Sequence, residues 1–216
     1  MKKTTNQTML KRTAAVLAAA CVCAALPVSA AEYRAATAQD AAETVSRDCI
    51  AEAMSIGILE NQEGNWNETI TREQFCNLIY NMVNKAKELP MAKLARSPFD
   101  DTDNPKVNAL QFVGIISGKA ERIFAPAEKL SREEAAIILV RCADYVGLEL
   151  PMIKVDMSYA DNSEISPWAV SSVYRLKVPG ILEDRDGAFA PQAALTGEEA
   201  LSMLIKFHSM IPSESK

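Results

Sequence analysis

Three helix starts in this sequence carry the side chains from which a binding site could be built. Thr71, Ser131 and Thr196 each stand three residues before a Gln or Glu, the capping-box pattern that opens a helix. The residue after the cap is Arg72 in the first copy and Arg132 in the second. An arginine there faces the positive end of the helix dipole and is locally unfavourable. A local cost that recurs in this way often marks function.

The overall charge makes each placed arginine important. The 216-residue chain has 23 Lys and Arg against 28 Asp and Glu, a net charge of −5. Without residues 1–30, which hold four basic residues and no acidic one, 19 basic residues face 28 acidic ones and the net charge is −9. A chain this acidic has no general attraction for nucleic acid or anionic lipid. Binding of an anion must therefore depend on a few placed cations.

The first 30 residues are expected to be a secretory signal peptide. Four basic residues precede a short apolar run at 14–26, and a small-residue cleavage site ends at Ala30. The run is too short to span a bilayer comfortably, and no later segment is apolar enough to do so. The mature chain is expected to start near Ala31. A lipoprotein acylated at Cys21 is the less favoured alternative, because "LAAAC" matches the required Leu-rich box poorly.

Three cysteines follow the expected signal peptide, at Cys49, Cys76 and Cys142. Their number is odd and their spacing fits no metal site. All three lie among apolar neighbours in expected helices, which favours buried free thiols. A Cys49–Cys76 disulfide is the alternative that the sequence leaves open. We expect no metal ion and no cofactor.

The capping boxes belong to a unit that occurs three times. In each unit a helix ending in Gly-Ile-aliphatic is followed by a loop with an aromatic residue, and then by the capped second helix. The first helices are expected at 49–59, 107–116 and 173–182, and the loop aromatics are Trp66, Phe124 and Phe189. Apolar residues recur at helical spacing, and strand signals are absent from the sequence. The aromatics are expected to plug the joint between the two helices.

A helix pair of this kind cannot bury its apolar face alone, so the three units must pack on one another. The sequence therefore predicts an all-α fold with a single domain over residues 31–212. Its helix-loop-helix repeats are expected at about 40–88, 97–148 and 157–212, before a short tail at 213–216.

The second and third units also begin with an aromatic-x-Asp heading that ends at Asp101 and Asp161, and the third continues with Trp-Ala at Trp168. This order of motifs, followed by a helix ending Gly-Ile, Gly-x-Phe-x-Pro and Ile-Thr-Arg-Ala-Glu, resembles the S-layer homology (SLH) repeat. The resemblance covers about residues 40–212, with the first and third repeats degenerate.

The resemblance implies both a fold and a ligand. SLH domains with three repeats form a pseudo-threefold, three-pronged helical domain, in which one helix per repeat joins a central bundle. They typically anchor exported bacterial proteins non-covalently to secondary cell-wall polysaccharide, often through a pyruvylated amino sugar in grooves between repeats. The implied protein is secreted and cell-wall associated, with that polysaccharide as its partner and other surface-layer proteins as a second class of partner. No nucleic acid and no membrane span are expected.

The same resemblance connects the arginines with the ligand. A pyruvate ketal carries a carboxylate, and a helix N-terminus offers free N–H groups and partial positive charge to an anion. An arginine adds a planar fork suited to bidentate carboxylate binding. The ligand-binding residues implied are Arg72, Arg132, Asp101, Asp161, Trp168, Thr71 and Ser131.

Departures from the SLH pattern limit the number of working grooves. Gly197 replaces the arginine in the third repeat, and the groove that it would serve is expected to bind weakly or not at all. The first repeat lacks the heading aromatic and the Trp, so at best one or two grooves are expected to work. Structural ion pairs of the arginines with Asp101 and Asp161 are an equal alternative to ligand binding. Trp168 is expected to pack rather than to serve as a sugar platform, although an exposed Trp could stack on a sugar.

Catalysis is not expected. His208, the only histidine, lies on the last helix without a Ser or Cys partner motif. The adjacent Glu pairs at 133–134 and 198–199 point in different directions around a helix. We expect a non-catalytic polysaccharide-binding protein, with a degenerate protein–protein interaction or assembly module as the alternative. Sugar binding would need exposed arginine head groups, whereas a structural module would bury them in ion pairs.

Overall fold

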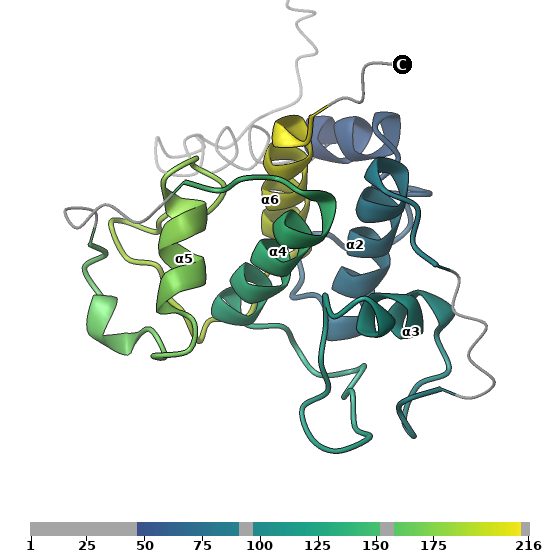
Figure 1. Cartoon of the computed structure of the whole chain (residues 1–216). Helices are drawn as coiled ribbons and strands as arrows, with labels where there is room; N and C mark the ends of the chain where they lie inside the picture. Colours follow the sequence, from purple (N-terminus) through teal and green to yellow (C-terminus); the bar gives the residue numbers. More distant parts are fainter. Residues whose placement is uncertain (1–46, 91–96, 152–157, 213–216) are drawn as a thin grey trace, which may run out of the picture. The chain divides into compact units, whose positions relative to one another are not determined.

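The segments that present the three caps are helices, as the sequence predicts. The computed structural model describes residues 47–90, 97–151 and 158–212. Residues 47–55 are helical, and the elements that follow are α2 (Arg72–Ala86), α3 (Pro105–Phe112), α4 (Arg132–Val146), the 3-10 helix η1 (Asn162–Glu164), α5 (Val170–Lys177) and α6 (Gly197–Met210) (Figure 1). Within these ranges β pairing is limited to isolated bridges. The all-α prediction is confirmed, and the expected signal peptide and tail lie outside the described residues.

The local signals at the helix ends have formed as predicted. In each capping box the Thr or Ser side chain accepts the N–H three residues on, and the Gln or Glu side chain accepts the N–H of the cap. The pairs are Thr71–Gln74, Ser131–Glu134 and Thr196–Glu199. The glycines that end the first helices, Gly57, Gly114 and Gly180, have φ values of 70°, 80° and 74°, as a left-handed helix terminus requires.

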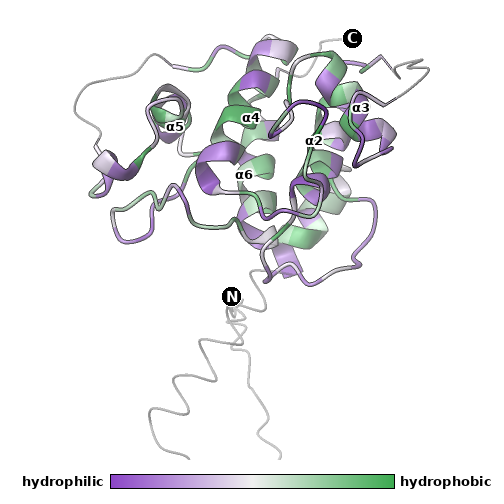
Figure 2. Ribbon diagram, turned by 90° about the horizontal axis from the view of Figure 1, so that it is seen from below, coloured by the Kyte–Doolittle hydropathy of each residue, from purple (hydrophilic) through white to green (hydrophobic). Residues whose placement is uncertain are grey.

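Helices α2 and α4 each pack mainly against the first helix of the unit that follows them. Helix α2 contacts α3, and α4 contacts α5, while α2 also touches α4 and α6. Figure 2 shows apolar stretches on α2, α4 and α6 alternating with polar ones, which is the pattern of helices that bury one face. The loop aromatics Phe124 and Phe189 are fully buried, as predicted, and Trp66 is half-buried. All described residues belong to one compact unit, Ala41–Lys216.

Three backbone hydrogen bonds join the residues before the caps into a closed cycle. The N–H of Ile70 donates to Leu195 O at 3.0 Å, that of Leu195 to Leu130 O at 2.8 Å, and that of Leu130 to Ile70 O at 3.3 Å. All three residues are buried, so water cannot replace a lost partner. Each unit therefore needs both others to satisfy its backbone. The pseudo-threefold arrangement itself stays a prediction, and this cycle is the feature that it would explain.

The cysteines follow the simpler of the two sequence interpretations. All three are free thiols, and Cys76 and Cys142 are buried as predicted, whereas Cys49 is half-buried. The alternative of a Cys49–Cys76 disulfide is therefore wrong. Burial raises the pKa of Cys76 to about 12 and that of Cys49 to about 11. Both groups are therefore protonated thiols at neutral pH, with low nucleophilicity.

The third helix start has Gly197 where the other two have an arginine. The N–H of Gly197 donates to Glu68 O at 2.9 Å, and that of Glu198 to Trp66 O at 2.7 Å. A Cβ at position 197 would lie 2.8 Å from Trp66 Cε3 and 2.8 Å from Trp66 O. The missing arginine thus has a steric reason, because the loop of the first unit occupies the space next to Gly197.

We predict that Gly197→Ala destabilises the protein. Gly-to-Ala changes within helices usually stabilise, but here the new methyl group would meet backbone as well as ring atoms of Trp66. Overpacking of this kind typically costs about 1–3 kcal/mol. Urea denaturation of the variant should show a lower midpoint with an unchanged slope. A midpoint equal to or above that of the parent protein would contradict the steric argument.

Candidate functional site

The guanidinium of Arg132 is a buried connector between the second and third units. Its Nε donates to Phe189 O at 2.7 Å, Nη2 to Glu183 O at 2.5 Å and Nη1 to Glu199 Oε1 at 3.1 Å. Its cationic centre lies 5.2 Å from the centroid of the Phe189 ring, within the range of a cation–π contact. Arg132 is 3 % exposed, and burial lowers its pKa while Glu199 opposes that change.

Arg72 repeats this arrangement between the first and second units. Its Nε donates to Phe124 O at 3.0 Å, Nη2 to Ser117 O at 3.2 Å and Nη1 to Glu134 Oε1 at 3.4 Å. Its cationic centre lies 5.0 Å from the Phe124 ring centroid. With 6 % of Arg72 exposed, both motif arginines meet the criterion for structural ion pairs.

The two heading aspartates build the loops that the arginines bind. Asp101 accepts the N–H groups of Phe124 at 2.9 Å and Ala125 at 2.7 Å. Asp161 does the same for Phe189 at 2.7 Å and Ala190 at 2.6 Å. Burial would raise the pKa of each aspartate, but these backbone hydrogen bonds lower it below the usual value.

This geometry changes the expected partner of the arginines. The sequence-based alternative paired them with Asp101 and Asp161, but their ion pairs are made with Glu134 and Glu199. Each aspartate instead holds the peptide whose carbonyl accepts the arginine Nε. Ala125 and Ala190 have φ values of 60° and 54°, a conformation that costs a non-glycine residue energy and that the aspartate hydrogen bonds stabilise.

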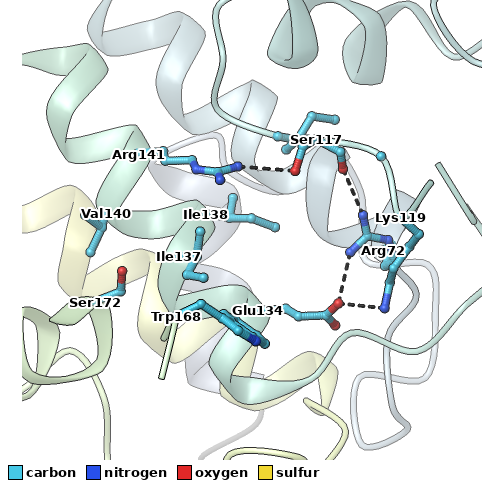
Figure 3. A pocket seen from close by; sticks show the side chains of 12 residues that line it. Arg72, Ser117, Lys119, Glu134, Ile137, Ile138, Val140, Arg141, Trp168 and Ser172 are labelled. Carbon is cyan, nitrogen blue, oxygen red and sulfur yellow. Dashed lines mark hydrogen bonds and ion pairs between the residues drawn. The ribbon is translucent and has the colours of Figure 1, made fainter. Parts of the chain in front are cut away.

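One groove is lined by three cationic side chains and an exposed aromatic ring (Figure 3). It has a volume of about 670 Å³. We call it the Trp168 groove. Its polar and aromatic lining consists of Arg72, Lys119, Arg141, Glu134, Ser117, Ser172 and Trp168, and its apolar lining includes Ile116, Ile137, Ile138 and Val140.

Glu134 organises one wall of the Trp168 groove. Besides Arg72 it pairs with Lys119, whose Nζ lies 2.7 Å from Glu134 Oε1 and 3.3 Å from Glu128 Oε2. Partial burial would raise the pKa of Glu134, but the hydrogen bonds from Lys119 and from the Ser131 backbone lower it, as do the charges of Lys119 and Arg72. The carboxylate is therefore ionised at neutral pH, and it offsets one of the three positive charges in the groove.

Trp168 corrects a sequence-based expectation. It was expected to pack, but 57 % of the residue is exposed. It precedes α5, and the buried face at the start of that helix is supplied by Ala169 and Val173. The indole is thus free to present a flat apolar surface to the groove.

Two further grooves are acidic. One, the Trp66 groove of about 710 Å³, lies between α2 and the start of α3. Its charged lining is Glu60, Glu63, Glu73, Asp103 and Lys106. The other, the Cys49 groove of about 560 Å³, lies between α6 and the helix at 47–55. Its charged lining is Asp48, Glu52, Glu183, Glu198, Glu199 and Lys206.

The Trp168 groove brings together only part of the residues implied by the SLH resemblance. Arg72 and Trp168 line it, and the other five do not: Arg132, Asp101, Asp161, Thr71 and Ser131. Lys119 and Arg141 were missed because neither belongs to a repeated motif. Arg141 is the tenth residue of α4, where the other second helices have Asn81 and Lys206. The net negative charge of the chain was the only hint that single cations would matter.

Comparison with known proteins supports the SLH resemblance for part of the chain. Residues 107–136, which include most of α3 and the start of α4, match the model of the S-layer homology domain. An endoglucanase of Bacillus sp. (strain KSM-635) is 32% identical over 111 residues. That alignment covers 50% of this chain and 12% of the endoglucanase, so the chain spans about an eighth of that relative's length.

The described ranges contain neither a candidate metal site nor a candidate membrane span. No group of three or more His, Cys, Asp or Glu side chains there is placed to hold a metal ion. No helix within those ranges is both long enough and apolar enough to cross a membrane.

We predict that Glu134→Gln lowers the free energy of unfolding and makes that free energy less dependent on pH between pH 6 and pH 3. Gln can still cap the helix, as Gln74 does in α2, but the charge partner of Arg72 and Lys119 is lost. The folded-state pKa of Glu134 is lowered from its usual value of 4.5. Its contribution to stability is therefore present above that value and is lost as the pH falls through the lower folded-state pKa.

Urea unfolding between pH 6 and pH 3 tests this prediction. The variant should be less stable than the parent at pH 6, and it should lose less stability on acidification. Glu149→Gln, at an exposed carboxylate outside the helices, is the matched control and should follow the parent. Equal acid dependence in parent and Glu134→Gln would contradict the assigned ion pairs.

Proposed function

We propose that this chain is an exported, non-catalytic protein that binds an acidic secondary cell-wall polysaccharide non-covalently through the Trp168 groove. One observation carries the proposal: three cations and an exposed indole line one groove of a chain whose net charge is −5. The match of residues 107–136 to the S-layer homology domain supports association with the cell surface and with a wall polymer. A pyruvylated amino sugar is the ligand that we favour.

The lining of the groove suits a charged sugar. A sugar ring has apolar C–H faces that can stack on an exposed indole, and hydroxyls that can bond to Ser172 or to backbone groups. The cations supply attraction for a carboxylate or a similar anion. The two acidic grooves would repel the same ligand. We therefore propose one polysaccharide site, rather than one per repeat.

A protein–protein interaction or assembly module is the second candidate. It is favoured by the burial of Arg72 and Arg132, because both head groups are engaged between units as a purely structural role requires. Under this candidate the Trp168 groove would be a protein contact, and stripping polysaccharide from the wall would leave binding unchanged.

We predict that residues 31–216 co-sediment with purified cell walls from the source organism and not with walls stripped of secondary polysaccharide. Trp168→Ala should lower the affinity roughly fivefold or more, because it removes the stacking surface. Phe112→Ala is the control: Phe112 is 59 % exposed and does not line the groove, so its loss should leave binding unchanged. If the folded parent protein binds stripped walls as well as intact ones, the polysaccharide proposal is wrong.

A further inference from the structure

We propose that Arg141, and not the motif arginine Arg72, recognises the anionic group of the saccharide, and that Ser117 leaves Arg141 available to do so. The inference rests on the proposed function and names the residues that would give the Trp168 groove its specificity. It concerns an oxyanion carried by a sugar, either a carboxylate or a phosphate.

The donors of Arg72 are already committed. Its Nε, Nη1 and Nη2 each donate to a protein acceptor, and 6 % of the residue is exposed. A ligand that used this guanidinium would have to displace buried hydrogen bonds that connect two units, at the cost of unsatisfied carbonyls. Arg72 therefore forms part of the wall of the groove and leaves little for a ligand.

Lys119 is also engaged. Its ammonium lies between the carboxylates of Glu134, at 2.7 Å, and Glu128, at 3.3 Å. Those carboxylates raise its pKa, with the hydrogen bond to Glu134 as the largest cause. Its positive charge is thus locally compensated, and its attraction for a further anion is reduced accordingly.

Arg141 differs from both. Its Nη1 makes a single long hydrogen bond, 3.5 Å, to the hydroxyl of Ser117, and the residue is half-buried at the edge of the groove. Figure 3 shows the guanidinium directed toward Ser117 across the groove, with Ile137 and Ile138 drawn between Arg141 and Trp168. A guanidinium with most of its donors uncommitted is suited to bidentate binding of a carboxylate or phosphate.

In the other two units an acidic residue stands at the position of Ser117. The residue two positions after the Gly-Ile dipeptide is Ser117 in the second unit, but Glu60 in the first and Glu183 in the third. In the Cys49 groove Glu183 forms an ion pair with Lys206, the counterpart of Arg141. That position therefore decides whether the groove cation is neutralised from within the protein. The neutral Ser117 leaves Arg141 uncompensated.

The Trp66 groove lacks an available cation for a related reason. Asn81, the counterpart of Arg141, is neutral and donates to Ile58 O at 3.0 Å. The nearby Lys106 is held by Glu60 at 2.6 Å. Of the three grooves, the Trp168 groove is thus the one whose described lining offers a weakly paired arginine.

The test is titration calorimetry of residues 31–216 with polysaccharide isolated from the cell walls of the source organism. Arg141→Gln and Ser117→Glu should each weaken binding by about tenfold or more, the first by removing the charge and the second by neutralising it in place. Ser117→Ala removes the hydroxyl without adding a negative charge, so it should weaken binding less than Ser117→Glu does. Arg175→Gln, an equal charge change on α5 outside the groove lining, is the matched control.

The outcomes distinguish a failure of polysaccharide binding from a failure of the role given to Arg141. If the folded parent fails to bind, the proposed function is wrong and this inference with it. If the parent binds and Arg141→Gln resembles Arg175→Gln, polysaccharide binding holds and the role of Arg141 is wrong. Circular dichroism should show that all four variants are folded, since positions 141, 117 and 175 are not fully buried.

Chemical treatment of the polysaccharide identifies the oxyanion. Reduction of its carboxylates to alcohols should abolish the difference between parent and Arg141→Gln if the group is a carboxylate. Removal of phosphate should do so if the group is a phosphate. If neither treatment alters the difference between parent and variant, recognition of an oxyanion by Arg141 is contradicted.

Discussion

The rest of this structure depends on the burial of two guanidinium groups at the junctions between units. Arg72 and Arg132 each donate to two loop carbonyls and one carboxylate of the following unit. A buried charge is tolerated only where such partners compensate its desolvation, and loss of one partner leaves the other uncompensated. Each junction therefore has a defined geometry. The junction at Arg72 positions one wall of the Trp168 groove, because Arg72 and Glu134 both line it.

The aspartates contribute to the same junctions through the loop backbone. Asp101 binds the N–H of Phe124, whose carbonyl accepts Arg72, and Asp161 serves Phe189 and Arg132 in the same way. Motif residues that could be taken for ligand contacts thus form a chain of structural hydrogen bonds. At the third junction the loop carrying Trp66 approaches Gly197 so closely that no side chain fits.

Distribution of charge among the grooves then separates them by the ligands that they can accept. An anion entering the Cys49 groove or the Trp66 groove would meet several carboxylates and one paired lysine in each. In the Trp168 groove the balance is reversed, and an exposed indole is added. Charges a few ångströms apart in a partly desolvated groove interact strongly. The differences in charge therefore influence which ligand each groove accepts more than the similar backbone frameworks do.

The sequence by itself determined the helices, their capping boxes, the glycine helix ends and the all-α class. These features depend on contacts within a few residues, which the order of side chains specifies directly. Only the tertiary structure decided that Arg72 and Arg132 are buried, that they pair with Glu134 and Glu199, and that Trp168 is exposed. It also joined Lys119 and Arg141 to the groove, through contacts with Glu134 and Ser117 that lie far from them in the sequence. Such contacts arise only when the units pack, because no local rule states which side of a helix meets which loop.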